Sequence, residues 1–213
     1  AIATGATWRR DGGSRQHVVQ MPINRGAKVY TPDDLMAGNV PTGNVVVYDD
    51  DHYYMGGVLA ELLVKNGAKV TFITPSAYVS DWTNNTLEQA TIHARLAEMG
   101  VDIILNRGVS AIAADHVVSD CVYTGRTQEY ASDCVVMVAS RTGNDDVYTA
   151  LVARQADWAD AGIKSIKMFG DAEAPGPIAW STYAGHRYAR ELDGKDIGDA
   201  LPFRREITEL AVD

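Results

Sequence analysis

The chain has 213 residues, a formal net charge of −9 at pH 7 and 46% hydrophobic residues, which suits a globular protein with a sizeable core. This acidic balance argues against a nucleic-acid surface, because phosphate binding requires clustered Lys and Arg side chains. No apolar stretch approaches the length of a membrane span, and the N-terminus lacks the pattern of a secretory signal. We therefore expect a cytoplasmic protein that binds neither nucleic acid nor membrane.

The cysteines and histidines give little sign of metal chemistry. Cys121 and Cys134 both lie in strand-like runs, and two thiols are too few to hold an iron–sulfur cluster. We interpret them as buried or half-buried thiols in a reducing compartment, with a disulfide as the alternative. The five histidines are scattered, and none has metal-ligand spacing with a second His or Cys, so no metal site is expected.

The first half of the chain shows a βαβ rhythm. Residues 44–48 form a short apolar run that is typical of a strand buried on both faces. Residues 55–66 repeat their apolar positions at helical spacing, and Gly67 is a good helix terminator. Residues 69–74 form the next strand-like run, which predicts a parallel crossover.

A second helix and a β-rich segment follow. Thr86 is expected to cap a helix that ends at Gly100, and residues 101–105 again have the pattern of a strand. From residue 110 the pattern changes to short β runs separated by turn signals. We expect an antiparallel ribbon there, inserted before a last buried strand over residues 134–139.

The final third is expected to contain a helix over 145–160, a strand over 163–169, a helix over 177–191 and a surface tail from Gly194. Together these elements predict an α/β, Rossmann-like FAD/NAD(P)-binding fold, with a parallel sheet, flanking helices and the antiparallel ribbon. The expected domains are an NAD(P)-binding-like domain over 39–157 and the remnants of a second, interrupted dinucleotide-binding domain over 1–38 and 158–213.

The turn after the strand at 44–48 carries three consecutive carboxylates, Asp49, Asp50 and Asp51. A dinucleotide turn needs glycines there, and two like charges about 4 Å apart repel by about 4 kcal/mol at a dielectric near 20. The next strand ends in residues 74–77, without the acidic residue that would hold a ribose. We predict an NAD-like shape without NAD binding. We interpret the turn as a solvated acidic turn at a helix N-terminus, with a cation site as the alternative.

At this point the residues resemble a known family. The matching segments are IATGATW (2–8), VYTPDDLMAG (29–38), VVVYDDDHYYMGGVLAELL (45–63), TLEQ (86–89) and GDAEAPGPIAWSTYAGHRYARELD (170–193). They resemble the C-terminal third of the trimethylamine, dimethylamine and histamine dehydrogenase group, within the 2,4-dienoyl-CoA reductase class of flavin oxidoreductases. The resemblance is most specific in the GDAEAP helix and in the glycine-poor turn over 49–57.

The resemblance implies a larger parent enzyme. That parent would carry an N-terminal TIM barrel with FMN and a 4Fe-4S cluster, oxidise a secondary or tertiary amine and pass electrons to an electron-transferring flavoprotein. One of its C-terminal domains would hold a structural ADP in place of FAD, and the other would be empty. We therefore expect this chain to be a C-terminal piece that is inactive alone. Its expected partners are the missing N-terminal domains and further copies in a homo-oligomer.

The resemblance also assigns candidate nucleotide-binding residues, and none that is catalytic or binds metal. They are Thr4, Gly5, Ala6, Gly170, Asp171, Pro177 and Ile178. Gly5 would allow close approach of the nucleotide, and Asp171 would accept hydrogen bonds from hydroxyl groups. The last helix would offer free N–H groups to phosphate at its start. The alternative for each residue is a simple strand-to-helix turn.

Two other functions stay open from the sequence. One is an NAD(P)H-dependent flavin reductase of the 2,4-dienoyl-CoA reductase type, against which the acidic turn speaks. The other is a non-enzymatic module that docks to an electron-transfer partner. His52 and His186 are interpreted as half-exposed polar residues, rather than as an acid–base cluster and an anion clamp.

Overall fold

The computed structural model describes residues 1–192, which fall into two compact units. Unit 2 comprises Thr7–Thr142, and unit 1 comprises Ala1–Ala6 together with the chain from Gly143 onward. The tail expected from Gly194 lies outside the described residues.

The chain passes between the units inside one strand pair, β1 (Ala6–Trp8) with β10 (Arg141–Gly143). This division differs from the domain boundaries expected near residues 38 and 158. Residues 7–38 all belong to unit 2. Within them, β2 (Val29–Tyr30) pairs in parallel with β9 (Cys134–Val138). The assignment of an ADP/FAD-like and an NAD(P)-like role to the two parts stays a prediction.

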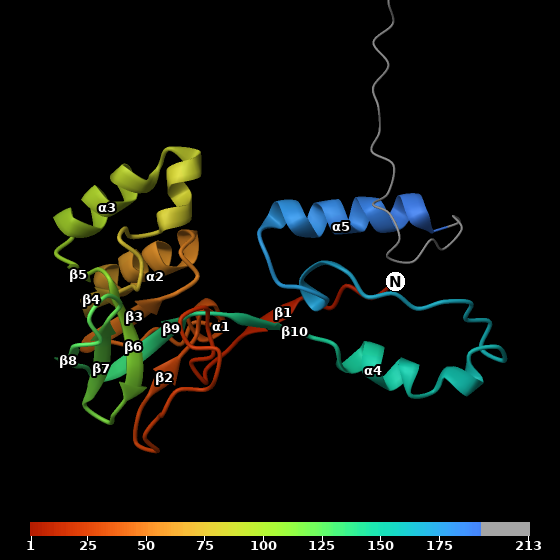
Figure 1. Cartoon of the computed structure of the whole chain (residues 1–213), viewed down its shortest axis with the longest axis horizontal. Helices are drawn as coiled ribbons and strands as arrows, with labels where there is room; N and C mark the ends of the chain where they lie inside the picture. The colour runs from red at the N-terminus through yellow and green to blue at the C-terminus, as the bar shows by residue number, and fades with distance from the viewer. Residues whose placement is uncertain (193–213) are drawn as a thin grey trace, which may run out of the picture. The chain divides into compact units, whose positions relative to one another are not determined.

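Unit 2 is built on a five-stranded parallel sheet with the strand order β2–β9–β3–β4–β5 (Figure 1). The remaining strands are β3 (Asn44–Asp49), β4 (Lys69–Ile73) and β5 (Asp102–Ile104). β3 lies at the centre, where Val47 is paired with Phe72 of β4 and with Val136 of β9. All but the first residue of β3 is buried, as expected for an apolar run covered on both faces.

The two faces of this sheet are covered differently, because successive strand residues point to opposite sides. Helices α1 (Pro32–Met36), α2 (Tyr54–Lys65) and α3 (Gln89–Glu98) contribute to the core on one face. There Val47 shares a core with Leu63 of α2 and Leu96 of α3. On the other face Val46 and Tyr48 share a core with residues of the antiparallel ribbon.

The ribbon consists of β6 (Arg107–Ile112), β7 (His116–Cys121) and β8 (Thr127–Ala131), paired in that order. It precedes the buried strand β9, as the sequence predicts. Parallel sheet, flanking helices and ribbon together confirm the predicted α/β, Rossmann-like fold.

The helix ends of unit 2 follow local signals, with one correction. Gly67 (φ 85°) and Gly100 (φ 79°) adopt the left-handed conformation just after α2 and α3, as expected for glycine helix ends. Thr86, however, does not cap α3. It ends the 3₁₀ helix η1 (Asp81–Thr86), and Leu87 follows at φ 63°, so the helix begins only at Gln89.

Unit 1 contains less regular structure than the sequence predicts. The helix expected over 145–160 is α4 (Asp146–Val152) followed by the 3₁₀ turn η2 (Gln155–Asp157). The indole N–H of Trp158 donates to the carbonyl of Leu151 (2.8 Å), which occupies a carbonyl that a continuing helix would use.

The strand expected over 163–169 is reduced to a single parallel bridge between Met168 and Ile2. A regular strand needs a hydrogen-bonded neighbour along its whole length. Among the described residues, this segment has such a neighbour only at Ile2. The segment leads into the 3₁₀ turn η3 (Gly170–Ala172) and then α5 (Ile178–Glu191), close to the predicted helix.

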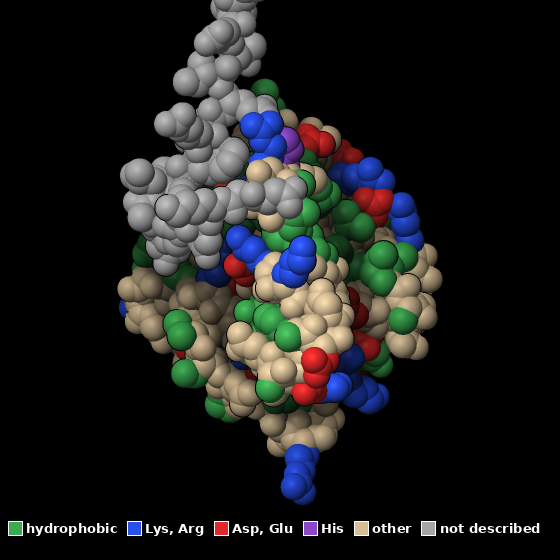
Figure 2. Space-filling model, turned by 90° about the vertical axis from the view of Figure 1, so that its right-hand side faces the viewer, with side chains coloured by type: hydrophobic (Ala, Val, Ile, Leu, Met, Phe, Trp, Pro, Cys, Tyr) green, Lys and Arg blue, Asp and Glu red, His purple; other side chains and the backbone are tan. Residues whose placement is uncertain are grey.

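Hydrophobic side chains of unit 1 lie largely at the surface. Ile2 and Ala172 are the buried hydrophobic residues of its described part, whereas Ile178 and Trp180 of α5 are 84% and 64% exposed. Figure 2 shows hydrophobic side chains in green among polar ones on one face of the molecule. Within residues 1–192 we find no helix with the length and apolarity needed to cross a bilayer.

Candidate functional site

The two glycine turns expected at the nucleotide lie side by side in unit 1. The N–H of Ile2 donates to the carbonyl of Lys167 (2.9 Å), and the N–H of Phe169 donates to the carbonyl of Ile2 (3.1 Å). These bonds place the segment that leads to Gly5 parallel to the segment that leads to Gly170. The fold therefore brings together residues that are far apart in the sequence.

Gly143 and Asn144 hold these turns together, and the sequence interpretation missed both. The backbone N–H of Asn144 donates to the carbonyl of Gly5 (2.9 Å). Its side-chain amide donates to the carbonyl of Thr4 (3.1 Å), and the Thr4 hydroxyl donates to the Asn144 carbonyl. A Cβ on Gly143 would lie 2.1 Å from the carbonyl oxygen of Ala172, so only glycine fits there. The Gly-Asn dipeptide was the available turn signal.

Gly5 and Gly170 are required by the backbone itself. Their φ angles are 74° and 66°, in the left-handed region that side-chain-bearing residues rarely adopt. A Cβ on Gly5 would meet no atom within 4 Å, whereas one on Gly170 would lie 3.7 Å from the Cβ of Ser181. The Gly5 backbone is thus open to close approach, and its contact with a nucleotide stays a prediction.

Asp171 stabilises the start of α5. Its Oδ1 accepts hydrogen bonds from the backbone N–H of Gly176 (3.1 Å) and from the hydroxyl of Ser181 (2.9 Å). Pro177 stands at the N-cap position in an extended conformation, and Ile178 begins the 14-residue helix. The structure therefore shows Asp171 as a positioning residue, and its contact with a nucleotide hydroxyl stays a prediction.

In unit 2 the acidic turn is buried, which corrects its interpretation as solvated. Asp49 and Asp50 are 0% and 1% exposed. The Oδ1 of Asp50 pairs with Nε2 of His52 (3.0 Å), and its Oδ2 accepts the backbone N–H of Gln16 (2.8 Å). His52 is likewise mostly buried, with its side chain 13% exposed, rather than a half-exposed polar residue.

Hydrogen bonding decides the ionisation of this pair. Burial alone would raise the pKa of Asp50, but the hydrogen bonds from His52 and Gln16 outweigh it and hold the pKa below its usual value. Burial would lower the pKa of His52, yet the bond to Asp50 and the nearby carboxylates raise it. Both shifts favour the charged forms, with Asp50 ionised beside a protonated His52.

Asp49 has fewer compensating contacts. Its Oδ1 accepts the backbone N–H of His52 (3.2 Å), while its Oδ2 has no hydrogen-bond partner among the described residues. Its Cγ would lie 2.7 Å from a Cβ on Gly56, so that glycine makes room for the carboxyl group. Burial raises the pKa of Asp49 to about 7, against the opposing charge of His52.

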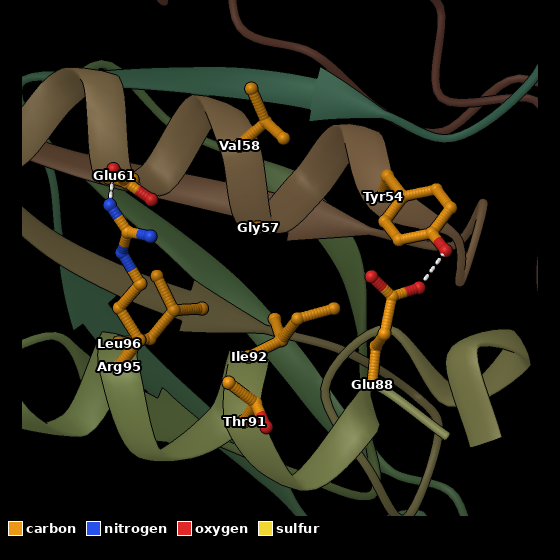
Figure 3. A pocket seen from close by; sticks show the side chains of 9 residues that line it. All are labelled: Tyr54, Gly57, Val58, Glu61, Glu88, Thr91, Ile92, Arg95 and Leu96. Carbon is orange, nitrogen blue, oxygen red and sulfur yellow. Dashed lines mark hydrogen bonds and ion pairs between the residues drawn. The ribbon is translucent and has the colours of Figure 1, made fainter. Parts of the chain in front are cut away.

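A groove of about 320 Å³ runs between α2 and α3 (Figure 3). Its lining residues are Tyr54, Gly57, Val58, Glu61, Glu88, Thr91, Ile92, Arg95 and Leu96. The Tyr54 hydroxyl donates to Glu88, and the Arg95 guanidinium pairs with Glu61. The polar groups of this groove thus pair with one another across two packed helices, and we do not assign it as the functional site.

Both cysteines are free thiols, as interpreted from the sequence. Cys121 is half-buried, and hydrogen bonds, first that of the Thr124 side chain, lower its pKa to about 7. Cys134 is buried, and this burial raises its pKa to about 11. Within residues 1–192 no group of three or more His, Cys, Asp or Glu side chains is placed to hold a metal ion.

Comparison with known proteins gives consistent matches. Residues 30–147, more than half of the chain, match the family described as the OYE-like second alpha/beta domain. Dimethylamine dehydrogenase of Hyphomicrobium sp. (strain x) is 31% identical in an alignment that covers 96% of this chain and 31% of that protein.

Solved structures agree with the sequence match. Histamine dehydrogenase from Rhizobium sp. 4-9 superposes with a TM-score of 0.91 and 64% identity, over 98% of this chain and 32% of that one. The 6-hydroxypseudooxynicotine amine oxidase of Pseudomonas geniculata N1 gives a TM-score of 0.79 and 36% identity, over 87% of this chain and 27% of that one. This chain thus spans about a third of the length of its relatives.

These matches confirm the resemblance to the trimethylamine, dimethylamine and histamine dehydrogenase group that the motifs indicate. The similar proteins are oxidoreductases that act on amines, and the matched part is their C-terminal region. The chain belongs to the OYE-like second alpha/beta domain family.

Proposed function

We propose that this chain is the nucleotide-fold region of an FMN/iron–sulfur amine dehydrogenase of the trimethylamine dehydrogenase type. The support is its similarity to dimethylamine and histamine dehydrogenases over 96% and 98% of its length. Because it spans only 31% and 32% of those proteins, amine oxidation by FMN and a 4Fe-4S cluster is proposed for the parent, outside these residues. The chain alone is proposed to be inactive on amines.

Within that parent, unit 1 is proposed to supply part of an ADP or FAD site. The observation that carries this proposal is the junction at Gly143 and Asn144, which holds two glycine turns together. The backbone at Gly5 is open to approach by a nucleotide, and the first N–H groups of α5 suit a phosphate. The residues therefore fit such a group. ADP there would be structural, because it lacks a redox-active ring.

The parent protein offers a direct test. After its purification, we expect an FMN spectrum, iron, and close to one ADP or FAD per chain on acid extraction and chromatography. Histamine is the first amine to test for anaerobic bleaching of the flavin, since the relative named for it is 64% identical. A preparation that contains no adenine nucleotide, or whose flavin is reduced by NADPH and by no amine, would contradict the proposal.

A matched pair of variants tests the assigned turn. Gly5→Ala and Gly67→Ala each place a Cβ at positive φ (74° and 85°) with no atom within 4 Å. We expect both to cost about 1–2 kcal/mol of stability, because left-handed backbone is strained for alanine. Only Gly5→Ala should also lower the nucleotide content of the parent. Equal nucleotide content in the two variants would remove Gly5 from the site.

Two partner assignments belong to the same proposal. The parent would pass electrons to an electron-transferring flavoprotein and would assemble as a homo-oligomer. The net charge of −9 permits docking to a basic surface. A complex that weakens as salt increases would support this docking, and its absence at low salt would refute it.

A further inference from the structure

In unit 2, residues 11–20 form an irregular segment, here called the strap, that lies at the carboxyl ends of β9 and β3. The Ser140 hydroxyl, two residues beyond β9, donates to the carbonyl of Gly13. The Asp50 carboxylate, directly after β3, accepts the backbone N–H of Gln16 (2.8 Å). In open parallel sheets this edge is where ligands bind, so the strap occupies the crevice that a dinucleotide would enter.

The strap continues across this edge through its side chains. The guanidinium carbon of Arg15 lies 5.9 Å from the ring centre of Trp82, in the 3₁₀ helix η1 between β4 and α3. Gln16 packs toward β6, where its Cγ would lie 2.9 Å from a Cβ on Gly108. The strap thus has contacts at β9, at β3, after β4 and at β6.

The base of the strap is closed and anchored. The N–H of Met21 donates to the carbonyl of Asp11 (3.0 Å), and the Asp11 carboxylate accepts the N–H of Gly13 (3.1 Å) and pairs with Arg9 (2.7 Å). Met21 itself is only 6% exposed and belongs to the core beneath the ribbon. This is a defined conformation fixed at both ends.

The hydrogen bond from the Gln16 N–H to the Asp50 carboxylate, here called the latch, has the reverse polarity of a nucleotide site. In a dinucleotide crevice, backbone N–H groups of the turn bind a phosphate of the ligand. Here the turn supplies a buried carboxylate, whose charge is balanced by His52 at 3.0 Å, and the strap supplies the N–H group. A phosphate would have to displace the strap and would then face Asp49, Asp50 and Asp51.

We infer that the strap is an internal occupant of the dinucleotide crevice of unit 2, latched by Asp50. The sequence already predicts that this domain does not bind NAD, and the strap adds a physical obstacle to the charge of the acidic turn. This inference is independent of the ADP or FAD site proposed for unit 1.

Hydrogen exchange of the full chain, followed by mass spectrometry, tests the latch. Asp50→Asn removes the charge of the acceptor, and Gln16→Pro removes the donor N–H while leaving the Asp50–His52 pair intact. Hydrogen bonds to charged groups are stronger than those between neutral groups. We therefore expect the amides of residues 12–18 to exchange about tenfold to a hundredfold faster in each variant. Exchange in β3 and β9 should stay slow in Gln16→Pro.

Two controls match these changes. Gln16→Ala keeps the backbone donor, and Asp115→Asn neutralises an exposed carboxylate that also pairs with a histidine, at 2.7 Å. Asp115→Asn should leave exchange in the strap unchanged, and Gln16→Ala, which removes only the side-chain contact at Gly108, should raise it far less than Gln16→Pro. If Asp50→Asn fails to fold, Gln16→Pro against Gln16→Ala decides the question.

A second arm adds millimolar NADPH to the unmodified chain and to the parent protein. We expect no added protection over residues 11–20 or 49–57 in either. Protection by NADPH at these residues, or strap exchange in the unmodified chain at the rate of an unstructured peptide, would overturn the inference. Loss of the ADP or FAD proposed for unit 1 would leave these readouts unaffected.

Discussion

At the scale of single residues, Asp49 and Asp50 are neighbours in the same buried turn, yet their environments shift their pKa values in opposite directions. Asp50 has a hydrogen bond on each oxygen, from His52 and from Gln16, and its pKa is lowered. Asp49 has one oxygen without a partner, and burial raises its pKa to about 7. The cost of burying this turn therefore falls mainly on Asp49.

We predict that Asp49→Asn stabilises the chain at pH 8 and gains less at pH 5. The pKa of Asp49 is about 7 when folded, above the ordinary aspartate value of 3.8, so the penalty for ionising it appears as pH rises between these values. Because one pKa unit corresponds to 1.36 kcal/mol, the penalty for ionising Asp49 is at most about 4 kcal/mol. Denaturant unfolding at the two pH values measures the difference.

Asp50→Asn provides the opposing case for that experiment. Its pKa is lowered in the folded state, so Asp50 contributes stability above its unfolded pKa and loses that contribution as pH falls. This variant should be destabilised at pH 8. A gain from Asp49→Asn that is equal at both pH values would show that the carboxyl group does not titrate as described.

At the scale of elements, α5 is the longest helix of the described chain, and none of its residues is buried. Asp171 holds its start, and near its end Tyr188 stacks on Phe169 with the ring centres 5.0 Å apart. Few tertiary contacts compensate for weak helix formers here, so intrinsic helix propensity matters more than it does in α2.

Gly185 in the middle of α5 should therefore respond to replacement. A Cβ there would lie 3.7 Å from Phe169, an ordinary contact, so Gly185→Ala is expected to stabilise α5 by about 0.5–1 kcal/mol. Gly143→Ala is the contrast, because its Cβ would clash with the Ala172 carbonyl at 2.1 Å and should cost about 1–3 kcal/mol. Hydrogen exchange of α5 measures both, and slower exchange in Gly143→Ala would contradict the clash.

At the scale of the whole molecule, the hydrophobic core is divided unequally. Both clusters of buried hydrophobic residues lie in unit 2, whereas Ile2 and Ala172 are the buried hydrophobic residues in the described part of unit 1. Because burial of apolar surface is the main favourable term in folding, the two units should differ in stability.

We expect native-state hydrogen exchange to separate the units. Amides of β3 and β9 should exchange only through the unfolding of unit 2, while amides of α5 should exchange through openings of much lower free energy. As denaturant increases, the exchange rates of the β3 and β9 amides should converge at the main unfolding transition. Protection of the α5 amides should be lost at lower denaturant. Equal protection in α5 and β3 would show that unit 1 has support beyond its two buried residues.

The sequence by itself determined most of the elements of unit 2 and the family. The apolar runs of β3, β4 and β9, the left-handed glycines after α2 and α3, and the change to short β runs in the ribbon are all local patterns. Local patterns are readable because backbone preference and side-chain periodicity act within a few residues. The motifs carrying the family resemblance are local in the same sense.

The tertiary structure decided the site, because its key contacts join distant residues. Asn144 and Thr4 are 140 positions apart, and Gln16 and Asp50 are 34 apart. Nothing in the run of three aspartates predicts that Asp50 is buried and accepts a hydrogen bond from the backbone N–H of Gln16. Nor does the pattern of 163–169 show that its strand partner is limited to Ile2. Hydrogen bonds of this kind depend on which backbone groups the packed fold leaves without a neighbour.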